Sequence, residues 1–205
     1  MPSAQELKSI WSDFSKAENG VFDFDEQVFP GGDKYKCSVS FNFTGFTVVF
    51  VAFRSRTATM GPLHRKDVTK VFVPLNSNSK FQLDITPENF GHQLLKMVGV
   101  TELELGNSEL DPKYFIRTNE KELTREILTD STVEKLLLDM FPLQLRTKNK
   151  RGLTETELPV NTKLLLFESD EVLTDRSFLK NLLVLFKALG TGLKKNTITQ
   201  HQLSK

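Results

Sequence analysis

The fold is decided by the stretch YKCSVSFNFTGFTVVFVAF, residues 35–53. Its first part places an apolar side chain at every second position from Tyr35 to Phe43, and side chains at that spacing project from one side of a β-strand. The Thr44-Gly45 pair then predicts a tight turn, and residues 46–53 form a second, more continuously apolar run. We therefore predict a β-hairpin with one face on a hydrophobic core.

Further strands are predicted on both sides of this hairpin. Apolar runs or alternations occur at residues 21–24, 68–75, 81–85, 103–105, 114–117, 143–146, 153–158 and 163–167. Because these runs come in blocks and do not alternate strictly with helices, antiparallel pairing is favoured over a doubly wound parallel sheet. The first half of the chain is thus predicted to be an antiparallel meander.

Helices are predicted from their start signals and their apolar stripes. Capping-box spacings, in which Ser or Asn precedes Glu by three positions, mark helix starts at Ser3, Asn119 and Ser131. Thr86-Pro87 predicts a further short helix that ends near residue 98, and a last amphipathic helix is predicted over about 175–189. We expect such helices to cover the antiparallel sheet, which defines an α+β fold.

The length, composition and net charge are those of an ordinary globular protein. It has 205 residues, 39% of them hydrophobic and 26% charged, and a formal net charge of +1. A domain of this length buries roughly 70% of the surface that its unfolded chain exposes. We predict a single α+β domain over residues 1–193 and a flexible tail over 194–205. An alternative division of the domain is into two halves, each with strands and a helix.

Several classes of site and location are disfavoured. The single cysteine, Cys37, excludes an intramolecular disulfide and a multi-thiolate metal site, and no disulfide-linked partner is expected. Residues 1–6 lack the features of a secretory signal, and no run approaches the ~18 apolar residues of a membrane span. Neither glycine-rich phosphate-loop signature nor a Gly-x-Ser-x-Gly elbow occurs, so no cofactor is predicted. The expected location is the cytoplasm.

Carboxylates are the first candidates for chemistry. Asp23, Asp25 and Glu26 form the densest cluster, and paired carboxylates can perform acid–base work or hold a hard cation. The cluster alternates with phenylalanines and lacks the spacing of a calcium loop, which is typical of a strand with one solvated face. The enzymatic alternative is a hydrolase or transferase that uses Asp23, Asp25 or Asp111.

The cysteine and the histidines give weaker signals. Cys37 lies in the alternating run that faces the predicted core, where a thiol is inert. His64, His92 and His201 are far apart and show no zinc-site spacing. We predict no metal site and no catalytic residue from this set.

Two clusters of basic residues are candidates for binding an anion. The first brackets a predicted loop, beside His64, and consists of Arg54, Arg56, Arg65 and Lys66. The second crowds a predicted hairpin tip and consists of Arg146, Lys148, Lys150 and Arg151. A net charge near zero and the lack of interleaved aromatic residues argue against a dedicated nucleic-acid surface. Weak binding of nucleic acid or an anionic ligand stays an alternative.

The last predicted helix has two interpretations. Its leucine and phenylalanine stripe, together with nearby lysines, fits a membrane surface or a partner protein, and it also fits packing on the chain's own sheet. We favour packing on the sheet, because an antiparallel sheet needs a cover on its apolar face.

One stretch resembles a known family. Residues 110–119, LDPKYFIRTN, lead to Ile127-Leu128-Thr129 and Leu136-Leu137, after a Leu103-Glu104-Leu105 strand. This succession is similar to a family of uncharacterised bacterial proteins, and the similarity is densest over residues 100–140. The resemblance implies a bacterial source, and it transfers no functional residue.

These observations favour a non-catalytic binding or interaction module. A protein partner is compatible with it, whereas nucleic acid and membrane are disfavoured as partners. Two features discriminate the hypotheses: an enzyme needs a concave pocket with converging polar groups, and an interaction module needs an exposed groove or sheet edge.

Overall fold

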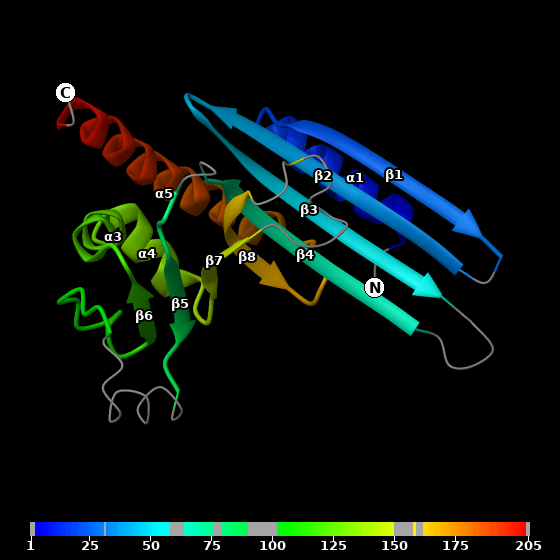
Figure 1. Cartoon of the computed structure of the whole chain (residues 1–205). Coiled ribbons are helices and arrows are strands. Elements are labelled where there is room, and N and C mark those ends of the chain that lie inside the picture. Colours follow the sequence, from blue (N-terminus) through cyan, green and yellow to red (C-terminus); the bar gives the residue numbers. More distant parts are fainter. Residues whose placement is uncertain are drawn as a thin grey trace.

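The computed structural model describes residues 3–30, 32–57, 64–75, 79–89, 102–149, 158 and 162–203. Their strands form one sheet in the order β1-β2-β3-β4-β8-β7-β5-β6, and every pair of neighbouring strands is antiparallel (Figure 1). The predicted α+β fold with an antiparallel sheet is confirmed.

The first half of the sheet is a meander of four long strands. They are β1 (Val21–Phe29), β2 (Gly32–Phe43), β3 (Phe46–Thr57) and β4 (His64–Pro74). The hairpin predicted from residues 35–53 is the pair β2–β3, in which Phe43 lies opposite Phe46. Gly45 in its turn has a φ of +87°, a backbone conformation that a residue with a Cβ rarely adopts.

The second half of the sheet consists of shorter strands. They are β5 (Leu83–Pro87), β6 (Tyr114–Thr118), β7 (Leu145–Asn149) and β8 (Lys163–Ser169). The chain leaves β4 for β5 and returns at the end through β8, which pairs with β4. This return joins the two halves into one sheet.

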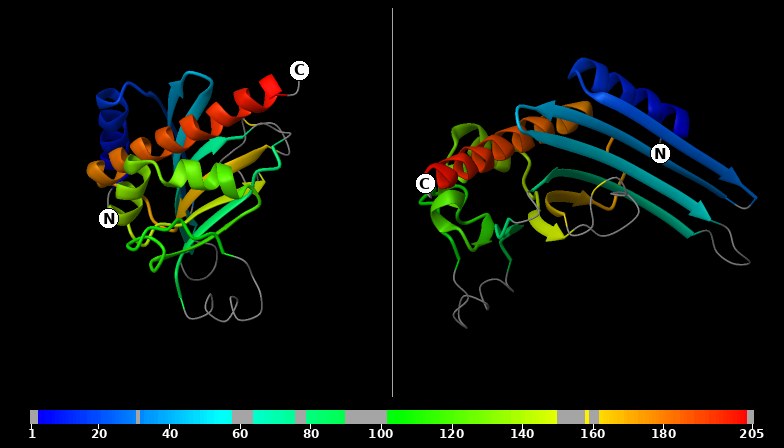
Figure 2. Two further views of the ribbon diagram at one scale, coloured as in Figure 1. Left: turned by 90° about the vertical axis from the view of Figure 1, so that its left-hand side faces the viewer. Right: turned by 45° about the horizontal axis from the view of Figure 1, so that its top comes forward.

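The helices lie on one face of this sheet (Figure 2). They are α1 (Ala4–Ala17), α3 (Lys121–Leu128), α4 (Ser131–Asp139) and α5 (Arg176–Leu203). α1 contacts β1 and β2, α5 contacts β3 and β4, and α3 and α4 pack against α5. Phe14 of α1 meets the rings of Phe41 and Phe50 edge-on, each at 5.4 Å between centroids.

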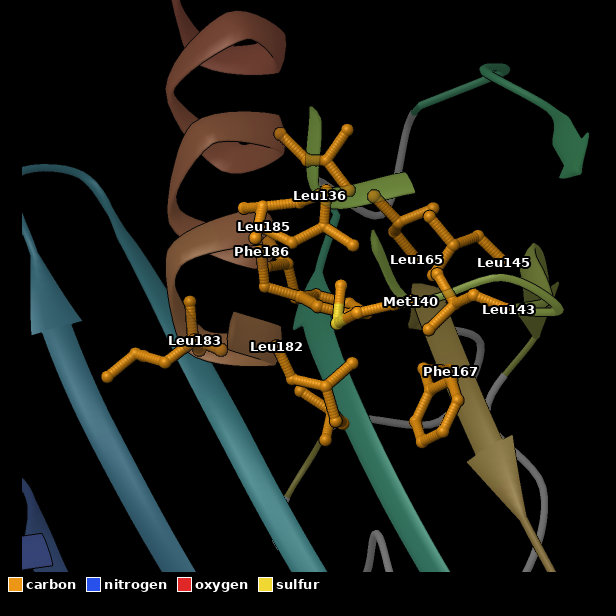
Figure 3. Packing of buried hydrophobic residues seen from close by; sticks show 14 of the residues in the cluster. Leu136, Met140, Leu143, Leu145, Leu165, Phe167, Leu182, Leu183, Leu185 and Phe186 are labelled. Carbon is orange, nitrogen blue, oxygen red and sulfur yellow. The ribbon is translucent and has the colours of Figure 1, made fainter. Parts of the chain in front are cut away.

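The larger hydrophobic cluster runs between these two layers, and a smaller one, of Val51, Phe72, Leu164 and Leu166, lies on the other face of the sheet. One buried cluster joins residues from Leu7 in α1 to Leu189 in α5. Figure 3 shows its centre, where Leu182, Leu185 and Phe186 of α5 lie over side chains of α4, β7 and β8. Alternation in β2 sends Tyr35 and its apolar successors into this core, as the sequence predicts.

Several predicted element boundaries are wrong. Residues 102–105 are not a strand, although the Leu103 N–H donates to the Ile116 carbonyl at 2.9 Å beside β6. The last helix continues to Leu203, well past the end predicted near residue 189, and the flexibility of the tail from residue 194 stays a prediction. Pro87 ends strand β5 and does not begin a helix there. Residues 90–101 and, apart from residue 158, the predicted strand 153–158 lie outside the described residues.

The helix caps are partly as predicted. Ser3 and Glu6 form the expected capping box on α1. α4 is capped instead by Asp130, whose carboxylate accepts hydrogen bonds from the N–H groups of Thr132 and Val133. Asn119 does not cap α3, because its side chain bonds backbone groups near β5.

In the described part of the chain, no helix has the length and hydrophobicity to cross a membrane.

Candidate anion-binding pocket

A pocket of about 560 Å³ opens where strands β5 and β7 separate. The two strands pair only at Asp84 with Arg146 and at Ile85 with Leu145. Beyond these pairs, the Thr147 hydroxyl accepts a hydrogen bond from the Leu83 N–H at 3.1 Å. The side chain of Thr147 therefore replaces the backbone hydrogen bonds that would continue the pairing of β5 with β7. The pocket lies at this break in the pairing.

Three charged side chains form a row across neighbouring strands at this pocket. Asp84 on β5 lies opposite Arg146 on β7 and opposite Arg117 on β6. The residues that alternate with them, Ile85 and Ile116, are buried in the core, so the charged side chains project from the face away from the helices. The strand register thus places Arg117 and Arg146 on either side of Asp84. The Arg117 guanidinium pairs with Asp84, and the Arg146 guanidinium donates to the Gln144 side-chain oxygen at 3.5 Å.

Cationic side chains dominate the described lining of the pocket. They are Arg117, Arg146, Lys148 and Lys163, against the carboxylate of Asp84. The side chains of Arg117 and Lys148 remain 49% and 41% exposed, so both are accessible to a ligand. The Lys163 ammonium donates to the Phe81 carbonyl at 3.2 Å, which holds it at the pocket.

The lowered pKa of the neighbouring Glu168 shows that the electrostatic potential of this region is positive. Lys148 donates to Glu168 at 2.9 Å, and Glu168 is half-buried. Burial opposes the charged form of Glu168, but the Lys148 hydrogen bond and the charges of Lys148, Lys70 and Arg146 outweigh burial and lower the pKa of Glu168. The same field stabilises any other anion that enters beside these cations.

The polar end of β6 holds the pocket wall in place. The Asn119 amide accepts from the Gln82 N–H at 2.7 Å and donates to the Lys80 carbonyl at 2.8 Å. The Thr118 hydroxyl donates to the Gln82 carbonyl at 2.8 Å. These bonds tie β6 to the residues before β5, so the backbone that carries Arg117 and Asp84 is preorganised.

The lining chemistry is suited to binding. The described lining residues contain neither histidine, cysteine nor serine, and no second carboxylate accompanies Asp84. A pair of carboxylates is therefore not assembled among them, and the hydroxyls of Thr118 and Thr147 are bonded to the backbone of Gln82 and Leu83. The lining offers guanidinium and ammonium groups, together with hydroxyls and amides, which are the donors that recognise phosphate or carboxylate.

The second predicted basic cluster meets this pocket, and the first does not. Arg146 and Lys148 line the pocket, whereas Lys150 and Arg151 lie outside the described residues. Arg54 is 1% exposed and donates to Asp67 at 2.8 Å, so the two residues form a buried ion pair. The prediction that Arg54 binds an anion at the surface is therefore wrong.

The rest of the first cluster lies on the other half of the sheet. Arg56 on β3 is opposite Arg65 on β4, and the neighbouring Lys66 is exposed at the same hairpin end. The side chains of Arg65 and His64 lie outside the described part. These residues share no described pocket with Arg146 and Lys148.

The predicted enzymatic carboxylates are separated by the fold. Asp23 and Asp25 lie exposed on β1, at one end of the sheet. Asp111 lies before β6, at the other end, and its carboxylate accepts hydrogen bonds from the N–H groups of Leu105, Gly106 and Asn107. Asp111 therefore stabilises a turn, and the three carboxylates share no site.

Cys37 is enclosed in the core, as predicted from its strand. Its exposed fraction is 0%, and burial raises the pKa of its thiol to about 12. The thiol is thus protonated at neutral pH and cannot act as a nucleophile. The side chains of the three histidines lie outside the described part of the structure.

Sequence reasoning missed Arg117, Lys163 and the carboxylate of Asp84. These residues come from three strands that are distant in the chain, and only the pairing of those strands brings them together. One signal was present: Arg117-Thr118-Asn119 is an unusually polar end to the apolar strand before it.

No family model, no curated protein and no solved structure matches this chain.

Proposed function

We propose that this protein is a non-catalytic binding module that holds a compact polyanion, such as a small molecule with two or more phosphate groups, in the pocket between β5, β6, β7 and β8. The observation that carries the proposal is the cross-strand row of Arg146, Asp84 and Arg117, with Lys148 and Lys163 beside it. Two arginines on the strands that flank β5 match an anion with several acceptor oxygens, because each guanidinium can donate two parallel hydrogen bonds.

The size and lining of the pocket favour a small molecule over a nucleic acid. Its volume of about 560 Å³ is within the range of small-ligand pockets, roughly 300–1,000 Å³. No aromatic ring is present among its described lining residues, so the pocket has no surface on which a base could stack. The amide of Asn149, which is an exposed residue in the lining, suits the hydroxyl or ester oxygens of such a ligand.

The direct test is calorimetric titration with inorganic tripolyphosphate at about 50 mM salt, where attraction between charges is strongest. We expect saturable binding by the native protein. The double variant Arg146→Met and Lys148→Met should bind at least about tenfold more weakly, because each charge-assisted bond contributes on the order of 1.5–3 kcal/mol.

A matched control separates a site from general charge attraction. Lys121 and Lys135 are exposed on α3 and α4, away from the pocket, and their double change to Met alters the net charge equally. The control should bind like the native protein. Absence of tripolyphosphate binding, or an equal loss in the control, would refute the proposal.

The expected bacterial source and cytoplasmic location belong to the same proposal. Support for a reducing compartment comes from the single cysteine, which is buried as a thiol. Support for a bacterial source comes from the resemblance over residues 100–140.

A further inference from the structure

Strand β1 ends the sheet with a long outer edge. All nine residues from Val21 to Phe29 pair with β2, and the described residues place no strand on the other side of β1. Figure 1 shows β1 as the outermost strand, and the second panel of Figure 2 shows its outer border away from α5. An edge of this kind presents unpaired N–H and C=O groups at every second residue.

The two edges of the sheet differ. At β6 the outer side receives the Leu103 N–H, which donates to Ile116, so a neighbouring segment covers part of that edge. At β1 the side chains of Val21 and Val28 are 64% and 78% exposed. The strand with the most exposed large apolar side chains is thus also a strand whose outer side pairs with no described strand.

We propose that β1 is a strand-addition site for an extended, lysine-rich segment of another protein. The charge along the edge selects this partner, because Asp23, Asp25 and Glu26 are all exposed on β1 and β1 itself has no cationic residue. In an antiparallel pair, side chains directly opposite each other interact most strongly, and opposite charges there are favourable.

Lysines on neighbouring elements do not cancel the preference of β1 for a cationic strand. Lys36 lies opposite Asp25 but on β2, and Lys8 of α1 lies over the Phe24 ring at 5.0 Å on the covered face. Lys34 of β2 lies over the Phe29 ring at 5.5 Å. An added strand lies about 4.8 Å from β1 but about 10 Å from β2, which is one Debye length at ordinary salt. The acidic side chains of β1 therefore dominate the field that the incoming strand meets.

A second copy of the chain is a poorer partner. Full antiparallel pairing of two β1 edges puts Asp25 opposite Asp25 of the second copy, and Asp23 of each copy lies diagonally nearby. Like charges directly opposite each other destabilise a strand pair. The acidic edge therefore opposes self-association and accepts a strand of opposite charge.

The test uses two fluorescein-labelled peptides of equal charge. One alternates lysine with valine over seven residues, and the other replaces two of its valines by proline, which removes the N–H groups that a strand pair needs. Fluorescence anisotropy should show the valine peptide binding at least about tenfold more tightly than the proline peptide, a difference of roughly 1.4 kcal/mol.

A charge variant then locates the site. The triple change Asp23→Asn, Asp25→Asn and Glu26→Gln should weaken binding of the valine peptide about tenfold, because the cross-strand charge pairs of Asp23 and Asp25 are lost, together with the attraction of Glu26 on the other face. The control triple neutralises exposed acids elsewhere: Glu109→Gln, Glu122→Gln and Asp170→Asn. This control should leave the affinity unchanged.

Hydrogen exchange gives a readout of strand addition itself. On peptide binding, amides of β1 should exchange more slowly, and those of α3 should not change. Equal binding of the two peptides, an equal loss in the control triple, or unchanged β1 exchange would each overturn the proposal. The pocket variants Arg146→Met and Lys148→Met should bind the peptide normally, so this inference and the proposed polyanion site fail separately.

Discussion

Arg117 on β6 and Asp84 on β5 are direct cross-strand neighbours, and the Arg117 Nη2 atom donates to the Asp84 Oδ2 atom. Arg146 lies on the opposite side of Asp84, on β7. The one carboxylate in the described pocket lining thus belongs to a strand between those of two arginines. It pairs with Arg117, which neutralises part of the charge of Arg117 and holds its guanidinium at the pocket.

The first prediction concerns this carboxylate. Asp84→Asn should tighten tripolyphosphate binding by about fivefold, because it removes a repulsion of roughly 1 kcal/mol between partly exposed charges. Titration calorimetry measures the change, with Asp139→Asn on α4 as a control of equal charge. Weaker binding by Asp84→Asn would instead show that Asp84 is needed to position Arg117.

The second prediction concerns the buried ion pair of Arg54 and Asp67. Their side chains are 1% and 9% exposed, and the Arg54 guanidinium also lies over the Tyr35 ring at 5.4 Å. Asp67→Asn should lower the free energy of unfolding by about 3–5 kcal/mol, because it removes the carboxylate that pairs with a buried guanidinium. Urea denaturation measures this.

An exposed ion pair is the control for that experiment. Arg176 and Asp13 join α5 to α1 at 2.6 Å, with side chains 58% and 46% exposed. Asp13→Asn should cost less than about 1 kcal/mol. Equal costs for Asp67→Asn and Asp13→Asn would contradict the role of burial.

The third prediction is a pH dependence from Cys37. Burial raises the pKa of this thiol to about 12, whereas an unfolded thiol titrates near pH 8.5. Above the unfolded pKa the folded state holds the proton more tightly, so stability is complete below about pH 8.5 and falls as the pH rises toward 12. Cys37→Ala lacks this linkage.

Urea denaturation of both proteins in reductant at pH 8 and pH 10 tests this. The stability difference between native protein and Cys37→Ala should move in favour of the variant by up to about 1.4 kcal/mol per pH unit above the unfolded pKa. A difference that is the same at both pH values would exclude a thiol held protonated by burial.

The fourth prediction separates two candidate caps of α4. Asp130 accepts hydrogen bonds from Thr132 and Val133 at 2.9 and 3.3 Å, and the adjacent Ser131 is the first helical residue. Asp130→Ala should destabilise the protein by about 1 kcal/mol, and Ser131→Ala by a few tenths at most. Thermal and urea unfolding measure both, and the reverse order would restore Ser131 as the cap.

The long hairpin, the first helix and the burial of Cys37 were predictable from sequence. Their signals are local, because alternation over residues 35–43 and the spacing of Ser3 and Glu6 need only neighbouring residues. For α4 the spacing of Ser131 and Glu134 predicted the wrong cap, because the preceding Asp130 caps the helix. The backbone conformation decided between Asp130 and Ser131, since only an extended residue can cap.

The candidate pocket was predictable only in part. The sequence alone determined the strand periodicity, a number of apolar residues sufficient for a core and the basic run that begins at Arg146. Tertiary structure alone decided that β7 would lie between β8 and β5, which sets Arg146 beside Asp84 and Arg117, and that Arg54 would face inward to Asp67. The physical reason is that a strand's periodicity specifies which side chains share a face, whereas its neighbours are chosen by packing between segments that are far apart in the chain.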